Sequence, residues 1–262
     1  MQENLGHQSI AKAFVEARKA ASILHSYPGD IPQSMDDGYA IQDIAIALDG
    51  RQIGGWKVGR VPPNHVEKFA AERLSGPIFV DEIAYESDGD GPEMPIFDDG
   101  FAAAEAEVLL RLGSVPDGEF NIDTIGQYID DVRVGIEIAS SPFTGINGYG
   151  PAVTVSDFGN NKGIVLGASI PGWRDADLLA MPVSLDIDGE TVGSNNMGEM
   201  LDGPFGSVVF LLELLKKRNI VITPGIWVSA GAITGVHDVA SGQTVKAKFG
   251  DDLEAACKLV AI

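Results

Sequence analysis

Cysteine is almost absent from this sequence, since Cys257 is the only one. A single cysteine excludes an intramolecular disulfide framework and fits a reducing compartment, and its apolar C-terminal surroundings favour a core position. Long apolar runs are also absent, so no segment predicts a membrane span. The N-terminal stretch "MQENLGHQSIAKAFVEARKA" is amphipathic and lacks the apolar core of a secretory signal. We therefore expect a cytoplasmic protein.

Basic residues are scarce. The 262 residues include 18 Lys and Arg against 38 Asp and Glu, a formal net charge of −20. Such a chain repels nucleic acid and anionic membrane surfaces, which excludes both as main partners. An anionic small molecule would need a local cation to bind. Because 45% of the residues are hydrophobic, the chain can bury a sizeable core.

Several catalytic signatures are missing as well. There is no G-x-S-x-G elbow, no P-loop and no G-x-G-x-x-G, the usual marks of esterases, NTPases and dinucleotide enzymes. The four histidines, at positions 7, 25, 65 and 237, show no spacing typical of zinc ligands.

The chain changes character near residue 50. Residues 8–26 and 35–48 have helical apolar periodicity, and Ser34 with Asp37 forms a capping box for the second helix. From residue 52 onward, short apolar runs alternate with Gly, Pro, Asp and Asn, a pattern typical of a mostly antiparallel, rolled sheet. Asp188-Gly189 predicts a hairpin turn, and residues 204–219 a helix. We expect an α+β fold, with a helical segment at 1–50 and a β-rich catalytic domain at 51–262.

Two carboxylates share one face of an apolar strand in "FAAAEAEVLLRL", residues 101–112. Because strand side chains alternate, Glu105 and Glu107 point the same way, about 7 Å apart along the chain. Two such charges at roughly 6 Å repel by about 3 kcal/mol at an effective dielectric near 20. A second apolar strand, "VRVGIEIAS", carries Glu137 opposite its apolar face.

If the two strands are neighbours, three carboxylates converge. Glu105, Glu107 and Glu137 would then form an oxygen-only site suited to Mg²⁺ or Mn²⁺. The alternative is that these are the solvated faces of edge strands, where a glutamate is usually found.

Lys57 in "GGWKVGR" and Asp81 in "PIFVDEI" are further polar residues in apolar runs. A partly buried ammonium at Lys57 could face a substrate carboxylate or transfer protons. The alternatives are a lysine that reaches out to water and an aspartate that caps a strand end.

Taken together, several stretches resemble the hydratase/decarboxylase branch of the fumarylacetoacetate hydrolase-like superfamily. The matching stretches are "GWKVG", "PIFVDEI", "EAEVLLRL", "GIEIASSPF", "SDFGNNKGIVLG", "DIDGETVG" and "SAGAITGVHDVASGQTVKAKFG". The resemblance implies a mixed β-roll body, a Mg²⁺ or Mn²⁺ held by Glu105, Glu107 and Glu137, and Lys57 and Asp81 as catalytic residues. Asn161 and Thr234 are candidates for substrate contact.

The function implied is the addition of water to a 2-hydroxy-2,4-dienoate, giving a 4-hydroxy-2-oxo acid in aromatic meta-cleavage catabolism. A 4-oxalocrotonate-type decarboxylase is the first alternative; an acylpyruvate carbon–carbon hydrolase and a non-catalytic scaffold subunit are the others. The expected partners are a small anionic 2-oxo or 2-hydroxy dienoic acid and further copies in a homo-oligomer. A partner decarboxylase or hydratase could also associate.

The chain departs from the family pattern at residues 158–162. Many relatives read Asn-Ala-Ser-Ser-Gly where this sequence reads Phe-Gly-Asn-Asn-Lys. Amides therefore replace two hydroxyls expected near the substrate. Ala106 replaces a frequent proline, and "GDDLEAA" replaces a glycine-rich ending.

Overall fold

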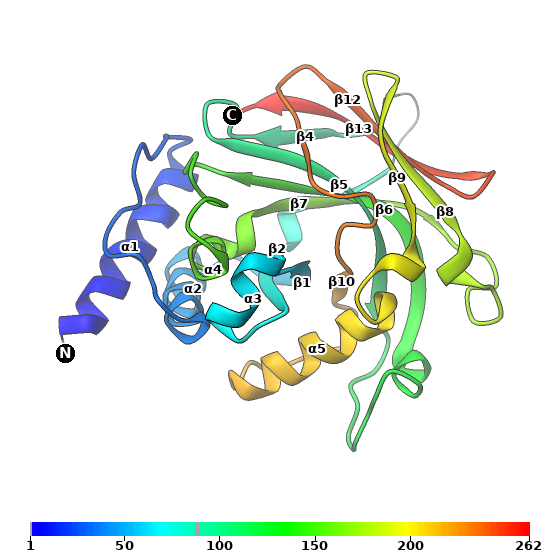
Figure 1. The fold of residues 1–262 in the computed structure, drawn as a ribbon, viewed down its shortest axis with the longest axis horizontal. Coiled ribbons are helices and arrows are strands. Elements are labelled where there is room, and N and C mark those ends of the chain that lie inside the picture. The colour runs from blue at the N-terminus through cyan, green and yellow to red at the C-terminus, as the bar shows by residue number, and fades with distance from the viewer. Residues whose placement is uncertain (1, 87–89) are drawn as a thin grey trace.

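The structure, a computed structural model, describes residues 2–86 and 90–262. Its helices are α1 (Gln2–Lys19), α2 (Met35–Asp49), α3 (Pro63–Phe69), α4 (Pro151–Ser156) and α5 (Gly203–Lys217), and short 3₁₀ turns adjoin several of the strands (Figure 1). The larger sheet contains β1 (Ile53–Arg60), β2 (Arg73–Phe79), β3 (Ile83–Tyr85), β5 (Phe101–Leu112), β6 (Ile129–Ser141), β7 (Asn161–Ser169), β10 (Trp227–Ser229) and β11 (His237–Asp238). The smaller sheet contains β4 (Glu93–Ile96), β8 (Pro182–Ile187), β9 (Glu190–Asn196), β12 (Thr244–Phe249) and β13 (Leu253–Ala261).

The sheets are mostly antiparallel, as predicted. The larger sheet has the order β2-β1-β10-β5-β6-β7-β3, with β11 added at β5, and the smaller has the order β4-β13-β12-β8-β9. Among the described strands, the parallel pairs are β1 with β10, β3 with β7 and β4 with β13. Long curled strands beside a second sheet and five helices confirm the mixed α+β roll.

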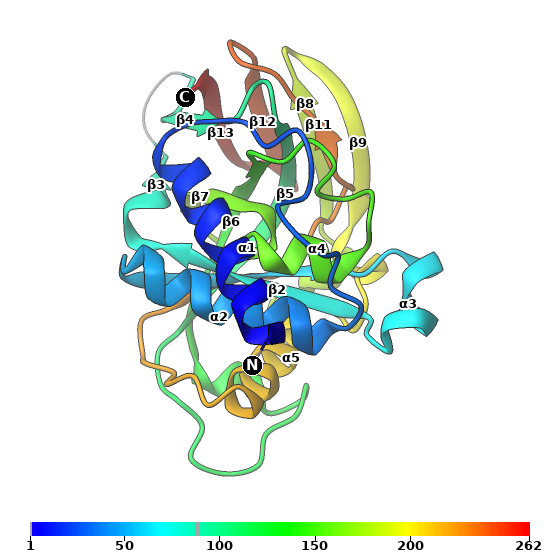
Figure 2. The same ribbon diagram turned by 90° about the vertical axis from the view of Figure 1, so that its left-hand side faces the viewer.

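Two long helices, α1 and α2, stand at one side of the molecule (Figure 2). The Ser34 hydroxyl accepts the backbone N–H of Asp37 at 3.1 Å, which confirms the predicted cap of α2. The first helix ends at Lys19, earlier than the periodicity predicted, because Ala21 takes a left-handed backbone with φ of 49°. α1 packs on α2, and α2 packs on α4.

The main apolar core lies between the two sheets. The apolar faces of β5 and β6, including Ala106, Val108 and Val134, pack with Val245 and Cys257 of the smaller sheet. Cys257 is therefore a core residue, as expected. Strand alternation turns the other face of β5 and β6, which carries the glutamates, away from the smaller sheet.

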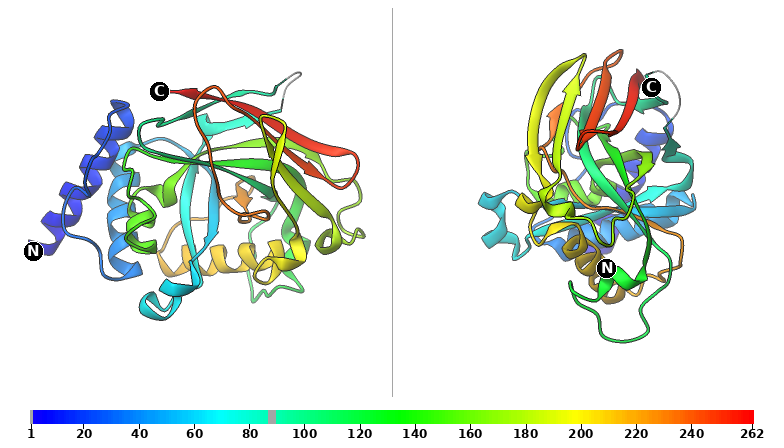
Figure 3. Two further views of the ribbon diagram at one scale, coloured as in Figure 1. Left: turned by 45° about the horizontal axis from the view of Figure 1, so that its top comes forward. Right: turned by 90° about the vertical axis from the view of Figure 1, so that its right-hand side faces the viewer.

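The hairpin and the long C-terminal helix follow the sequence. Asp188 and Gly189 have φ of 50° and 83°, the two positive values that the tight turn between β8 and β9 requires. α5 contacts β1 on the side of the molecule away from β12 and β13 (Figure 3). Within the described residues, no helix has both the length and the apolar character that a membrane crossing requires.

Candidate metal centre

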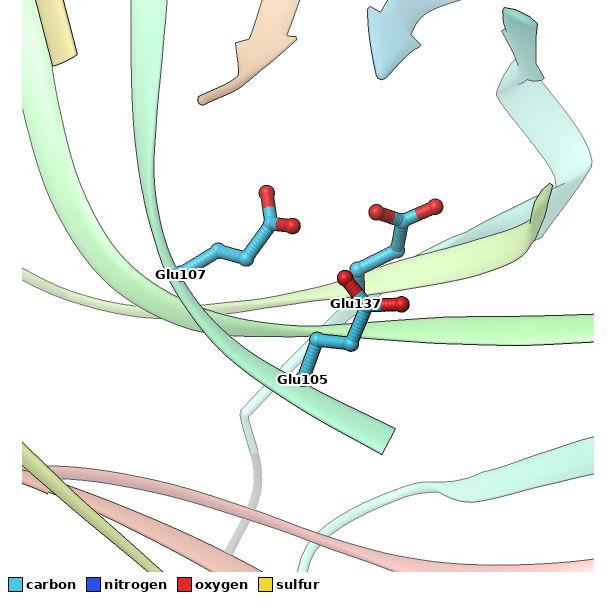
Figure 4. Close-up of side chains that lie close together, drawn as sticks. All are labelled: Glu105, Glu107 and Glu137. Carbon is cyan, nitrogen blue, oxygen red and sulfur yellow. The ribbon is translucent and has the colours of Figure 1, made fainter. Parts of the chain in front are cut away.

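Three buried carboxylates meet on the larger sheet. Glu105 and Glu107 project from β5, and Glu137 projects from β6, where it is the direct cross-strand partner of Glu105 (Figure 4). One oxygen from each lies within 4.8 Å of the others. Glu107 and Glu137 are fully buried, and Glu105 is 5% exposed. Like charges placed directly opposite one another destabilise a sheet, so the cluster needs a compensating cation.

Each fully buried glutamate has one oxygen held by the protein and one without a partner. Oε2 of Glu107 accepts the hydroxyl of Ser229 and the backbone N–H of Gly231. Oε1 of Glu137 accepts the Asn161 side-chain amide at 2.8 Å. Among the described residues, Glu107 Oε1 and Glu137 Oε2 have no hydrogen-bond partner. A buried carboxylate oxygen without a partner is costly, and a cation bound between these oxygens would remove that cost.

One lysine partly neutralises the cluster. The Lys57 ammonium lies 3.2 Å from Glu137 Oε1, and both side chains are buried. Burial by itself lowers the pKa of Lys57, but Glu137, Glu105 and Glu107 outweigh burial and raise it, so the ammonium stays charged. One positive charge against three ionised carboxylates leaves two negative charges, which matches a divalent cation.

Two of the carboxylates, Glu105 and Glu107, hold protons more readily than ordinary glutamates when no further cation compensates them. Burial raises the pKa of Glu105 to about 7, with Lys57 opposing the rise and Glu137 adding to it. Burial, together with the charges of Glu137 and Glu105, raises the pKa of Glu107 well above its ordinary value. These shifts have the signature of a functional carboxylate cluster.

The side chains come from five strands that are consecutive in the sheet. From β1 to β7 these strands supply, in sheet order, Lys57, Ser229, the pair Glu105 and Glu107, then Glu137, and finally Asn161. Lys57 and Ser229 are direct partners between β1 and β10. Neighbouring strands lie about 4.8 Å apart, so only this strand order brings residues distant in sequence into contact.

A cavity of about 410 Å³ opens onto the cluster. Lys57 and Glu105 border it at the cluster, and Asn147, Thr154 and Asn160 contribute polar side chains to its wall. Arg60 and Arg73 also border it, as does His65, so two guanidinium groups line this cavity in a strongly acidic protein. The cavity therefore suits a small anionic molecule.

Of the predicted site residues, Lys57, Glu105, Glu107, Glu137 and Asn161 are brought together. Asn161 contacts Glu137 rather than bordering the cavity. Thr234 lies in a loop whose neighbours Gly231 and Gly235 border the cavity, and its hydroxyl is buried without a partner among the described residues.

The structure does not bring Asp81, the remaining predicted catalytic residue, to this group. Its side chain is 62% exposed and forms an ion pair with Arg51 at 3.3 Å. The physical reason is a 3₁₀ turn at Val80–Glu82, which interrupts the predicted strand and directs Asp81 toward solvent. This position agrees better with the alternative interpretation, an aspartate at the end of a strand.

Sequence reasoning missed Ser229 and Gly231 as contacts of the cluster. The backbone N–H of Gly231 carries no sequence signal, and Ser229 becomes visible only through the β10–β5 register. Asn160 lies in the segment 158–162, where the sequence departs from the family pattern, and that departure pointed to its position near the site. Its side-chain oxygen accepts a 3.3 Å hydrogen bond from Lys57.

Comparisons with known proteins show what this chain is similar to. No family model matches it. The 4-oxalocrotonate decarboxylase of Pseudomonas putida is 25% identical over 247 residues, 92% of each chain. The 2-keto-4-pentenoate hydratase of Burkholderia vietnamiensis is 25% identical over 214 residues, 80% of each chain.

Solved structures agree on the fold. A 4-oxalocrotonate decarboxylase from Pseudomonas putida, complexed with magnesium and adipate, superposes with a TM-score of 0.80 over 97% of both chains at 19% identity. A fumarylpyruvate hydrolase from Pseudomonas aeruginosa, in complex with Mn²⁺ and pyruvate, gives a TM-score of 0.58 at 16% identity, covering 79% of this chain and 89% of its own. The chain is therefore similar in sequence to 4-oxalocrotonate decarboxylases and 2-keto-4-pentenoate hydratases, and it shares the fold of these solved structures.

Proposed function

We propose that this chain is a metal-dependent hydro-lyase of aromatic meta-cleavage catabolism. It adds water to a 2-hydroxy-2,4-dienoate, or its 2-oxo tautomer, to give a 4-hydroxy-2-oxo acid. The observation that carries this proposal is the convergence of Glu105, Glu107 and Glu137 beside Lys57, next to a cavity of about 410 Å³.

The donor set fits Mg²⁺ or Mn²⁺. Both are hard cations that prefer oxygen ligands, and the described part of the cluster contributes carboxylate oxygens without histidine or cysteine. Glu107 Oε1 and Glu137 Oε2 are free to bind the ion, while their other oxygens are fixed by Ser229 and Asn161. A divalent charge would also balance the cluster.

When bound, the ion would act as a Lewis acid that stabilises negative charge on the 2-oxygen of the substrate. Lys57 would attract the substrate carboxylate and hold a proton near it. Asn160 would restrain the Lys57 ammonium, to which its side-chain oxygen is bonded at 3.3 Å. Thr154 and Asn147, polar residues of the cavity wall, would hold the attacking water. We keep Thr234 as a weaker candidate for substrate contact.

Decarboxylation is the second candidate. It is favoured by the 4-oxalocrotonate decarboxylase that matches over 92% of the chain, compared with 80% for the hydratase. The same residues would serve, because loss of CO₂ also leaves negative charge on the 2-oxygen. Polar groups in the cavity wall favour the hydratase, since water must be held there to react.

Two substrates and two metals separate these functions. The protein is incubated with 2-hydroxypentadienoate and with 4-oxalocrotonate, each with Mg²⁺ and with Mn²⁺, while diene absorbance and CO₂ release are followed. Loss of the diene without CO₂ supports the hydratase, and CO₂ release from 4-oxalocrotonate supports the decarboxylase. Turnover of neither substrate contradicts both. Sedimentation of the same samples tests whether the chain forms the homo-oligomer that we also propose.

A further inference from the structure

Arg18, in the last turn of α1, reaches into the interior next to the metal centre. Its side chain is 5% exposed, and that of its partner Asp157 is fully buried. Arg18 Nε donates to Asp157 Oδ1 at 2.6 Å, and Nη2 donates to Oδ2 at 2.9 Å. The Ser141 hydroxyl also donates to this carboxylate at 2.6 Å. Two-point pairing of this kind fixes orientation as well as charge.

Arg18 Nη2 also donates to the backbone carbonyl of Asp157 at 3.3 Å, and two further hydrogen bonds of Arg18 extend beyond Asp157. Nη1 donates to the backbone carbonyl of Asn161 at 3.0 Å, and Nη2 donates to the carbonyl of Ser140 at 3.0 Å. The guanidinium therefore binds the chain immediately before and immediately after the segment Phe158–Asn160. It also lies over the ring of Phe158, 5.2 Å from the centroid.

That segment has an unusual backbone. Phe158, Gly159 and Asn160 have consecutive φ values of 54°, 64° and 56°, and only the middle residue is glycine. A residue other than glycine in this region costs on the order of 1–3 kcal/mol, so the surrounding contacts must hold the turn in place. Gly76 of β2 packs directly against it, since a Cβ at Gly76 would lie 1.9 Å from the Phe158 carbonyl oxygen.

The turn presents two adjacent amides to the cluster. Asn160 accepts from Lys57 at 3.3 Å and donates to the Asn147 side chain at 3.2 Å. Asn161 donates to Glu137 at 2.8 Å, and its own side-chain oxygen accepts the Gly163 N–H at 3.1 Å. Lys57 and Glu137 are themselves 3.2 Å apart, so the turn contacts both members of the central ion pair.

We propose that Arg18 is a positioning residue of the metal centre. By binding both ends of the left-handed turn, it sets the amides of Asn160 and Asn161 against Lys57 and Glu137. The inference rests on the proposed metal site. A buried ion pair contributes little net stability compared with well-packed apolar residues, so stability alone does not account for this arrangement.

The test compares two buried arginines. Arg18→Lys keeps the charge but loses the planar fork. Arg218→Lys is the matched control, because the Arg218 side chain is 6% exposed and ties α5 to α2 through Gln42 and Asp43. Mg²⁺ affinity by calorimetry, thermal unfolding, and kcat and KM are measured for each. Asn161→Ala keeps the Arg18 contacts and removes the side-chain hydrogen bonds of Asn161 to Glu137 and Gly163, and it serves as a second variant if Arg18→Lys does not fold.

We expect both arginine variants to unfold at lower temperature. Of these two, only Arg18→Lys should weaken Mg²⁺ binding, by about 10- to 100-fold, and Asn161→Ala should weaken it by a similar factor. Wild-type Mg²⁺ affinity in Arg18→Lys would overturn the positioning role. A wild-type protein that binds neither Mg²⁺ nor Mn²⁺ would overturn the proposed function instead. A crystal structure of Arg18→Lys would then decide the positioning role: a retained Asn161–Glu137 hydrogen bond refutes it, and its loss supports it.

Discussion

The ammonium nitrogen of Lys57 lies 3.2 Å from Oε1 of Glu137, and both side chains are buried. The two residues are 80 positions apart and come from strands β1 and β6, which are not neighbours in the sheet. Their contact crosses the strands between them, so it depends on the curvature of the larger sheet. This ion pair joins the carboxylate cluster to the cavity and is the basis of the first prediction.

Replacing Lys57 with methionine should abolish turnover while preserving the metal site. The ammonium borders the cavity, where we propose that it faces the substrate, and such groups contribute about 10²- to 10⁴-fold to rate. Mg²⁺ affinity should be kept or increased, because a competing positive charge is removed. Lys162→Met is the control, since Lys162 pairs with Glu82 at 2.8 Å and does not border the cavity. Equal kcat values for the two variants would contradict the role of Lys57.

Replacing Glu107 with alanine should remove metal binding. It deletes Oε1 of Glu107, a fully buried carboxylate oxygen without a hydrogen-bond partner among the described residues. We expect Mg²⁺ affinity to fall at least about 100-fold. Changing a residue that only supports a metal ligand lowers affinity by up to about 100-fold, and loss of a ligand should cost at least as much. Free Mg²⁺ at 100 times its dissociation constant should stabilise the wild type by about 2.7 kcal/mol and leave the variant unchanged. Thermal unfolding with and without Mg²⁺ measures the affinity and the stabilisation. An equal shift of the unfolding temperature in wild type and variant would refute the assignment of Glu107 as a metal ligand.

Replacing Gly76 with alanine should disturb the left-handed turn. The new Cβ would lie 1.9 Å from the Phe158 carbonyl oxygen, a backbone atom that cannot move alone. Overpacking of this kind costs about 1–3 kcal/mol, and Mg²⁺ affinity should fall with the displacement of Asn161. Gly118→Ala is the control, because no atom lies within 4 Å of that Cβ position. Urea unfolding and calorimetry measure the two effects; a variant as stable as Gly118→Ala would show that the packing at Gly76 is less tight than described.

The Glu82 ion pairs should make the stability of the protein sensitive to acid. Burial by itself raises the pKa of Glu82, but Lys162 and Arg51 outweigh burial and lower the pKa below 4.5. A depressed pKa stabilises the folded state above the unfolded value near 4.5, and this stabilisation is lost as the pH falls through the folded pKa.

Comparing the wild type with Glu82→Gln tests this dependence of stability on pH. The difference in unfolding free energy between wild type and variant should be largest at pH 7, of the order of the 3–5 kcal/mol expected for breaking a buried pair, and should shrink below pH 4.5. Urea unfolding at several pH values gives the difference, and a pH-independent value would rule out this linkage.

Asp81→Asn should leave turnover and metal binding close to wild type. Asp81 is 62% exposed and pairs with Arg51 at the surface, where ion pairs contribute about 0–1 kcal/mol. Steady-state kinetics of the variant beside Lys57→Met provide the check. A loss as large as that of Lys57→Met would restore Asp81 to the catalytic site.

Some features were predictable because their causes are local. The Ser34 cap depends on a side chain three residues from the N–H it accepts, and the Asp188-Gly189 turn depends on two positive φ values. The alternation in β5 and β6 separated an apolar face from one bearing carboxylates, which the structure confirms. The exposed position of Asp81 could not be predicted, because the 3₁₀ turn at Val80–Glu82 has no strong signal within an apolar run.

The sequence by itself determined the chemistry available: three strand glutamates on polar faces, a lysine in an apolar run, and a single cysteine. Tertiary structure decided which of these side chains meet. The order β1-β10-β5-β6-β7 places Lys57, Ser229, the glutamates and Asn161 side by side. Arg18, which lies 139 positions before Asp157, joins them only through the packing of α1. The physical reason is that strand order and helix packing depend on the summed burial of the whole core, which no local pattern encodes.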